Sequence, residues 1–177
     1  MFIDNLPKEI IPYDHRLSAK VKNNTVVCFY EKDSSLYRHL TKDKLFKVAS
    51  ELNKFGGFIG YDISIFIDFL RPFQEFYILA NLVIDIFFII NGNKMIPNLR
   101  SDETYGESYF YLFKEAPIVC AGTLGCSKYS TIKKKNKELI ANYLLKNKGQ
   151  QLIQYGSELV RLSNTIFYKS FRRVSHE

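Results

Sequence analysis

The sequence has no tryptophan and only three cysteines, which are Cys28, Cys120 and Cys126. An odd number of cysteines does not suit a disulfide framework, and two of the three lie inside apolar runs typical of buried strands. Their spacing matches no zinc-binding pattern, so no metal site is predicted from them. These features favour a reduced protein inside the cell, and we expect it to be cytoplasmic.

The sequence also lacks an export signal and a long apolar run. The N-terminus, MFIDNLPKEIIPYDHR, has no uninterrupted apolar core of the kind that a secretory signal requires. The longest apolar run, Phe76–Ile90, is interrupted by Asn81 and Asp85 and is shorter than the about 20 apolar residues that span a bilayer. We therefore expect a buried helix over about 72–90, with Pro72 near its start and Asn91 just after its end, and no membrane partner.

Short motifs for phosphate binding or nucleophilic catalysis are missing as well. The GxxxxGK[ST] spacing of a P-loop does not occur, and Ser157 lacks the glycines of a nucleophile elbow. Residues 122–125, GTLG, offer backbone N–H groups to an anion, but a plain tight turn explains them more simply. Cys126 precedes a basic stretch that would activate a thiol, yet the three histidines are remote in the sequence, so a packed cysteine is favoured.

Short apolar runs alternate with segments of helical periodicity along most of the chain. Strand-like runs cover residues 25–30, 57–62, 94–99, 117–122 and 151–155, and a further one covers 162–168. Apolar positions recur at helical spacing over 34–54, where we expect one or two helices. This alternation is typical of βαβ units and predicts an α/β fold, a single domain with a mostly parallel central sheet of about five or six strands flanked by helices. Residues 1–24 are expected to form an irregular N-terminal arm with at most a short element, and residues 25–177 the domain.

Polar side chains follow the predicted strands at the points where they stop. Asp62 follows the second strand, and Asn98 and Arg100 follow the third. Because the carboxyl ends of parallel strands share one edge of a sheet, where ligands bind, the sequence predicts a site at that edge. The candidate residues of this site are Asp62, Asn98, Arg100, Asp102, Glu103 and Cys126.

Two interpretations of this set are open. In one, the carboxylates and Asn98 hold Mg²⁺ or Mn²⁺ while Arg100 binds a phosphate, as in a nuclease or phosphotransfer enzyme. In the other, Arg100 pairs with the acids and ties loops together, and no cofactor is implied. We favour the second, because acids beside an arginine form structural networks easily and no stricter motif supports a metal.

An excess of positive charge gives a second functional signal. The chain has 25 lysines and arginines against 18 acids, a net charge of +7, which permits nucleic acid or an acidic protein as partner. A predicted helix over 132–146 is rich in lysine, and basic residues recur near the C-terminus. A solvated helix face explains these residues as well as nucleic-acid or partner binding does; they are Lys133, Lys134, Lys135, Lys137, Lys146, Arg172 and Arg173.

Five separated blocks of the sequence carry a resemblance. They are FYEKD (29–33), GYDISIF (60–66), NGNKMIPNLRSDET (91–104), TLGC (123–126) and YGS (155–157). In order and spacing they resemble the domain-of-unknown-function family 4417, found in phages, prophages and other mobile elements of bacteria. The resemblance implies a genomic context and no established activity. In one respect this chain departs from the family, because only Ser101 separates Arg100 from Asp102 where the family usually has an aromatic residue and a glycine.

Two functions follow as expectations. The first is a non-enzymatic accessory protein of a phage or mobile element that binds a host nucleoprotein or nucleic acid, with inhibition of host defence, as in anti-CRISPR proteins, its most concrete form. The alternative is a metal-dependent enzyme acting on a nucleic acid or another phosphate-bearing substrate. The altered spacing after Arg100 favours the first, and the sequence leaves the oligomeric state open.

Overall fold

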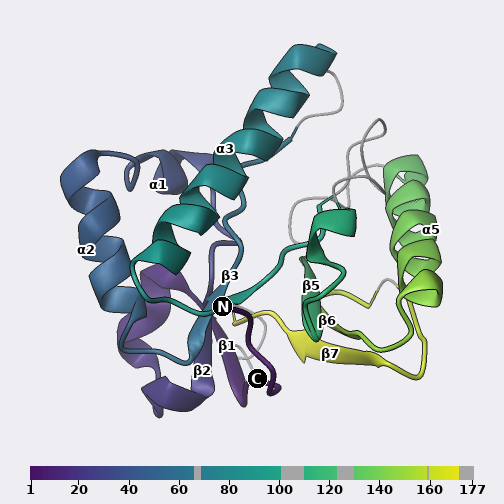
Figure 1. The fold of residues 1–177 in the computed structure, drawn as a ribbon, viewed down its shortest axis with the longest axis horizontal. Coiled ribbons are helices and arrows are strands. Elements are labelled where there is room, and N and C mark those ends of the chain that lie inside the picture. Colours follow the sequence, from purple (N-terminus) through teal and green to yellow (C-terminus); the bar gives the residue numbers. More distant parts are fainter. Residues whose placement is uncertain (66–68, 101–109, 123–129, 159, 172–177) are drawn as a thin grey trace. The chain divides into compact units, whose positions relative to one another are not determined.

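The computed structural model describes residues 1–65, 69–100, 110–122, 130–158 and 160–171, with the backbone alone for residues 130–136 (Figure 1). The contacts of the chain divide it into two units, Met1–Ile96 and Pro97–Glu177. Each unit has its own parallel sheet with helices, so the predicted α/β class and the parallel pairing of strands are confirmed.

The first unit contains a four-stranded sheet in the order β1-β2-β3-β4. All neighbouring pairs are parallel, so the carboxyl ends of the four strands lie along one edge. The strands are β1 (Glu9–Pro12), β2 (Thr25–Cys28), β3 (Gly57–Ile59) and β4 (Met95–Ile96). The helices are α1 (Asp33–Tyr37), α2 (Lys42–Leu52) and α3 (Arg71–Ile90), with short 3₁₀ helices η1 (Tyr13–Ser18) and η2 (Lys22–Asn24).

Aromatic rings fill the core of the first unit. Phe29, which follows β2, packs against Tyr61 with ring centroids 4.7 Å apart and stacks on Phe88 of α3 at 5.9 Å. Phe58 of β3 meets the edge of Phe88 at 5.4 Å. Because all four rings are almost fully buried, they fix α3 against the carboxyl half of the sheet.

The second unit contains a three-stranded parallel sheet in the order β5-β6-β7. Its strands are β5 (Ile118–Gly122), β6 (Gln151–Gly156) and β7 (Thr165–Lys169), accompanied by η3 (Tyr111–Phe113) and α5 (Ser130–Lys146). The buried amide of Gln150 donates to the carbonyls of Phe113 and Ala116 at 2.7 and 2.6 Å. This side chain therefore ties the start of β6 to the segment that precedes β5.

The strands are distributed over two sheets, where the sequence predicted one central sheet of five or six strands. The predicted third strand, 94–99, explains the difference. Its first part, β4, pairs with β3, whereas Asn98 forms a bridge with Cys120 of β5. Pro97 stands between these pairings and has no N–H to continue the first ladder.

The N-terminal segment was expected to be an irregular arm with at most a short element. Four of its residues form β1, which pairs in parallel with β2 from Glu9 opposite Thr25 to Pro12 opposite Cys28. A strand that ends in proline is tolerated here because β1 is at the edge of the sheet. As a consequence, residues just after β1 lie at the same sheet edge as Glu31 and Asp62.

The helix predicted over 72–90 is present as α3, but only one of its faces is buried. Asn81, Asp85 and Phe88 point into the first unit, while Phe76, Val83 and other large apolar side chains are exposed. By length and composition alone, α3 would also be able to cross a membrane. One helix of this kind is only weak evidence for a membrane span.

Candidate functional site

Asp62 lies where it was predicted, just beyond the carboxyl end of β3, and is 3% exposed. The chain around it is held by α3. The carboxylate of Asp85 accepts a hydrogen bond from the Tyr61 N–H at 2.7 Å. The amide of Asn81 bonds both the N–H and the carbonyl of Ile63, at 2.9 and 3.0 Å. Polar side chains of α3 therefore replace the hydrogen bonds that a longer strand would have made.

The carboxyl groups of Asp62 and Asp85 are both buried in this region. Burial raises the pKa of Asp85 well above its usual value, the Tyr61 N–H opposes that rise, and the charge of Asp62 adds to it. A neutral Asp85 side chain can still accept the Tyr61 hydrogen bond. Within the described part of the chain, no group of three or more His, Cys, Asp or Glu side chains is placed to hold a metal ion.

The other predicted strand-end residues belong to the second unit or lie outside the described residues. Asn98 is buried and bridges to Cys120, and its carbonyl accepts from the Arg100 N–H at 3.1 Å. Asp102, Glu103 and Cys126 lie outside the described residues. Since Asp62 belongs to the first unit and Asn98 and Arg100 to the second, their convergence on one site stays a prediction.

The predicted lysine-rich helix is present as α5. Lys137 and Lys146 are exposed, and Ile140, Tyr143 and Leu144 are buried as expected. The predicted cationic residues whose side chains lie outside the description are Lys133, Lys134, Lys135, Arg172 and Arg173.

The structure brings together a further cluster that sequence reasoning missed, at the carboxyl ends of β1 and β2. It surrounds a pocket of about 340 Å³, which we name the Tyr13 pocket. Arg16 comes from η1, Arg38 and His39 follow α1, and Lys44 and Lys47 come from α2. The full lining is Tyr13, Asp14, Arg16, Arg38, His39, Lys44, Lys47 and Val48.

One acceptor organises the inner wall of the Tyr13 pocket. The Tyr13 hydroxyl and the Arg16 Nε both donate to Oε2 of Glu51, each at 2.6 Å. The Arg16 guanidinium lies 4.0 Å from the centre of the Tyr13 ring, and Arg16 Nη1 donates to the Tyr13 carbonyl at 3.0 Å. The ring of His39 meets Tyr13 edge-on at 4.9 Å. Tyr13 is therefore held on three sides before any ligand enters.

Burial and hydrogen bonding set the charges around this pocket. Burial acts to raise the pKa of Glu51, but the hydrogen bonds from Tyr13 and Arg16 outweigh it and lower that pKa. Burial raises the pKa of Glu31 to about 7, although the Asp14 N–H, which donates to it at 2.8 Å, opposes the shift. Burial lowers the pKa of His39. Near neutral pH the Glu51 carboxylate is ionised, and His39 is mostly uncharged.

Four permanent cations thus surround the Tyr13 pocket: Arg16, Arg38, Lys44 and Lys47. The acids at the pocket are Asp14 in its lining, Glu51 in its wall and Glu31 beside Asp14. Glu51 is already engaged by Tyr13 and Arg16, and the raised pKa of Glu31 leaves it partly protonated near neutral pH. The pocket therefore keeps an excess of positive charge. Such a pocket at the carboxyl edge of a parallel sheet can bind an anion, and arginine and lysine match phosphate oxygens well.

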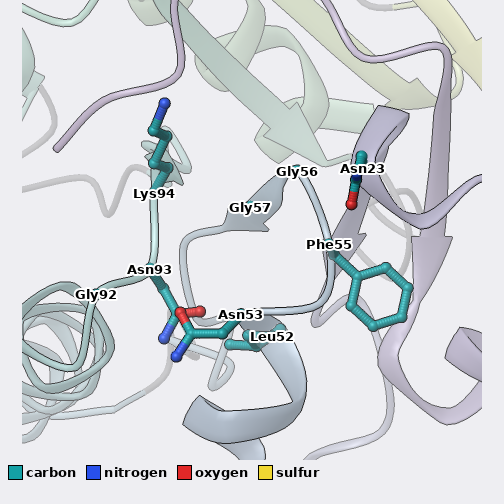
Figure 2. A pocket seen from close by; sticks show the side chains of 9 residues that line it. All are labelled: Asn23, Leu52, Asn53, Phe55, Gly56, Gly57, Gly92, Asn93 and Lys94. Carbon is teal, nitrogen blue, oxygen red and sulfur yellow. The ribbon is translucent and has the colours of Figure 1, made fainter.

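A second pocket lies at the opposite, amino edge of the same sheet and has a structural explanation. Figure 2 shows it between the loops around Gly56 and Asn93. Its volume is about 300 Å³. The buried Asn93 amide donates to the carbonyls of Ala49 in α2 and Phe88 in α3 at 3.2 and 3.0 Å. Gly57 has φ of +143°, and a Cβ there would come within 2.5 Å of the Lys94 carbonyl. These residues join the ends of two helices to the sheet, so we do not assign them a ligand.

A sequence signal for the Tyr13 pocket exists in α2. Lys44, Lys47, Val48 and Glu51 recur at the three- and four-residue spacing of one helix face. The spacing shows that these side chains share a face, but not what they face. Without β1, residues 13–16 could not be placed at a strand end, so the pocket was not predicted.

The architecture and this pocket define a parallel α/β protein with a cationic site at the sheet edge. The chain belongs to the family described as Domain of unknown function (DUF4417), whose model matches residues 1–171. The resemblance carried by the five sequence blocks is therefore confirmed. Neither the curated proteins nor the solved structures contain a significant match to this chain.

Proposed function

We propose that this protein is a non-enzymatic accessory protein of a phage or mobile element that binds nucleic acid, free or within a host nucleoprotein, in the cytoplasm. Inhibition of a host defence system is the most concrete form of this role. The observation that carries the binding proposal is the Tyr13 pocket, where four cationic side chains surround about 340 Å³ at the carboxyl edge of the sheet. Exposed lysines of α5, Lys137 and Lys146, offer a second set of phosphate contacts in the other unit.

The charge and the position of the Tyr13 pocket favour a phosphate backbone as its ligand. Neutralising backbone phosphates releases condensed counterions, which makes this contact favourable for any sequence of bases. Arg38, Lys44 and Lys47 are exposed, so they can reach a phosphate without unfolding the site. Arg16 is fixed by Glu51 and Tyr13, and a preorganised guanidinium loses little conformational entropy on binding.

The direct test is fluorescence anisotropy with labelled single- and double-stranded DNA and RNA at about 50 mM salt. The variant R38A/K44A/K47A removes three pocket cations, and K8A/K20A/K54A removes three exposed lysines of the same unit outside the pocket lining. We expect the pocket variant to weaken binding at least about tenfold and the control variant to weaken it less than about twofold. Equal losses in both variants would contradict a role for the pocket.

The nucleoprotein form of the proposal needs a separate experiment. The wild-type chain and the pocket variant would be used to capture partners from a bacterial lysate, and the captured DNA and RNA would be sequenced. We expect a nucleoprotein or nucleic acid to be enriched by the wild-type chain and lost with the pocket variant. If the wild-type chain captured neither a nucleoprotein nor nucleic acid, the proposal of a host nucleoprotein partner would be contradicted.

A second candidate function is a metal-dependent enzyme acting on a phosphate-bearing substrate. Asp62 supports it, because this carboxyl group is buried at a strand end, close enough for its charge to raise the pKa of Asp85. Here Asp62 would help to hold Mg²⁺ or Mn²⁺, and Arg100 would bind the phosphate. A nuclease and phosphatase assay with either metal tests it, with loss of activity expected in Asp62→Asn and Arg100→Ala. Absence of activity from the wild-type protein would contradict this candidate.

A further inference from the structure

Helix α3 has one face bonded into the first unit and an opposite face covered by apolar side chains. On the inner face, Gln74 donates to the carbonyl of Phe69 at 2.8 Å, and Asn81 and Asp85 bond the backbone of residues 61–63. Phe88 on the same face is fully buried. These contacts fix the rotation of α3 about its axis, and so determine which of its residues face away from the first unit.

The outer face carries six large apolar side chains that are between 55% and 74% exposed: Phe73, Phe76, Leu79, Val83, Ile86 and Ile90. At about 100° per residue, the last five lie within an arc of about 80°. Figure 1 shows the first turns of α3 projecting past α1 and α2 of the same unit. A continuous apolar stripe of this length on a globular unit marks an interaction surface.

The spacing of this stripe identifies the kind of partner. Phe76, Val83 and Ile90 are seven residues apart, and Leu79 and Ile86 lie three residues after the first two. This is the a/d pattern of a helix that packs along another helix, with the β-branched Val83 and Ile90 at two of the three a positions. The e and g positions, which flank this seam, hold one charged residue, Glu75. The others are Ala80, Leu82, Phe87 and Ile89.

We propose that α3 pairs with α3 of a second copy of this chain through the Phe76–Ile90 stripe. A copy of itself is the fitting partner because the seam is apolar throughout and has almost no flanking charge that would repel an identical helix. This proposal goes beyond nucleic-acid binding and does not depend on it.

The available area is sufficient for a stable pair. The five side chains of the Phe76–Ile90 stripe are each more than half exposed and offer on the order of 100 Å² apiece, hence about 500 Å² per copy. A symmetric pair would bury about 1,000 Å² in total, the area that a specific interface should at least reach. Phe46 of α2, whose ring lies 5.1 Å from Phe87, extends the apolar surface at its rim.

A lipid bilayer fits this face less well. To cross a membrane, α3 would have to break the hydrogen bonds of Asn81 and Asp85 and carry both groups into hydrocarbon. To lie on a membrane surface, a helix normally has lysines and arginines along its polar face, whereas α3 has Arg71 alone, paired with Glu75 at 3.1 Å.

The first test is the mass of the full-length protein in solution. Sedimentation equilibrium of the wild-type chain should give a dimer at micromolar concentration, and Val83→Lys with Ile86→Lys should weaken the dimer at least about 100-fold. Both sites are exposed, so the variant should keep the circular dichroism spectrum of the wild type. The control Leu145→Lys adds a charge at an exposed apolar residue of a different helix, α5, and should leave the dimer intact. A wild-type monomer up to about 100 µM would overturn the proposal, as would a double variant that dimerises normally.

The second test locates the contact. In a chain carrying Cys126→Ser, the native Cys28 and Cys120 are both buried, so an introduced cysteine is the reactive one. Val83→Cys should form a disulfide between two copies under mild oxidation, and Ser50→Cys, at an exposed site on α2, should remain monomeric. Equal cross-linking at both sites would overturn the pairing through α3. So would binding of the wild-type chain to phosphatidylcholine vesicles in place of self-association.

Discussion

The hydroxyl of Tyr13 donates a 2.6 Å hydrogen bond to the carboxylate of Glu51, across 38 positions of the sequence. This contact joins the end of β1 to α2 and builds the wall of the Tyr13 pocket. Tyr13→Phe keeps the ring and its contact with His39 but removes the donor. We expect the free energy of unfolding to fall by about 1 kcal/mol, which corresponds to a decrease of about 2–4 °C in Tm. Calorimetry checks this, and an unchanged Tm would contradict a structural role for the bond.

The raised pKa of Glu31 predicts a pH dependence of stability. The folded pKa is about 7 against an ordinary value of 4.5, so between these two values the folded protein holds a proton that the unfolded chain has released. Stability therefore falls as pH rises from about 4.5 to about 7, and the penalty is complete above that range. Glu31→Gln cannot ionise and can still accept from the Asp14 N–H. We expect it to be more stable than the wild type by on the order of 1 kcal/mol at pH 8, and equally stable near pH 4.

Urea denaturation of both proteins between pH 4 and pH 8 measures this difference. The stability of the wild type should drop relative to Glu31→Gln within the stated window. A constant difference across the whole pH range would show that Glu31 has the same pKa in the folded and unfolded states, which would contradict the raised pKa.

The hydrogen bonds from α3 to residues 61–63 should carry much of the stability of the first unit. Asn81→Ala leaves both the N–H and the carbonyl of Ile63 buried without their partner, which should cost about 2–4 kcal/mol. Glu75→Ala, on the exposed side of the same helix, should cost less than about 0.5 kcal/mol. Chemical denaturation compares them, and similar losses in both variants would contradict the importance of this junction.

The corresponding junction of the second unit is the amide of Gln150. Gln150→Glu replaces a donor with a carboxylate that faces the carbonyls of Phe113 and Ala116, and it should cost about 3 kcal/mol or more at neutral pH. Gln151→Glu is the matched control, because the side chain of Gln151, the next residue in the chain, is exposed at the start of β6. Hydrogen exchange at the amides of β5 and β6 should increase in the first variant alone. If the β5 and β6 amides of Gln150→Glu exchanged as slowly as those of the wild type, the Gln150 amide would not be the junction of this unit.

Elements with strong local signals were predicted from the sequence. β2 follows from the run TVVC, and α2 from the helical spacing of Leu45, Val48 and Leu52. Pro72 near the start of α3 and Asn91 at its end placed the limits of that helix within one residue. In each case the residues that determine the element lie inside it, so no tertiary contact had to be known.

The remaining features depend on contacts between distant segments. β1 has only four residues, ends in Pro12 and closely follows Pro7, and it becomes a strand because β2 offers it a partner. The separate sheets follow from the change of partner around Pro97. The proline itself signals an interruption of the strand, but no local pattern shows the new partner. The Tyr13 pocket needs residues from η1, from the end of α1 and from α2 at once. Of the predicted site, Asp62 is at the expected strand end, and its neighbours Asn81 and Asp85 were noticed only as interruptions of an apolar run.

The cations of the Tyr13 pocket are proposed to bind phosphates, and the salt dependence of nucleic-acid binding measures that contact. For duplex DNA the logarithm of the binding constant falls with the logarithm of salt concentration, with a slope of about 0.9 per phosphate contact. We predict that R38A/K44A/K47A lowers the slope by about 2 to 3 and that K8A/K20A/K54A leaves it unchanged. An equal slope for the wild type and the pocket variant would contradict the claim.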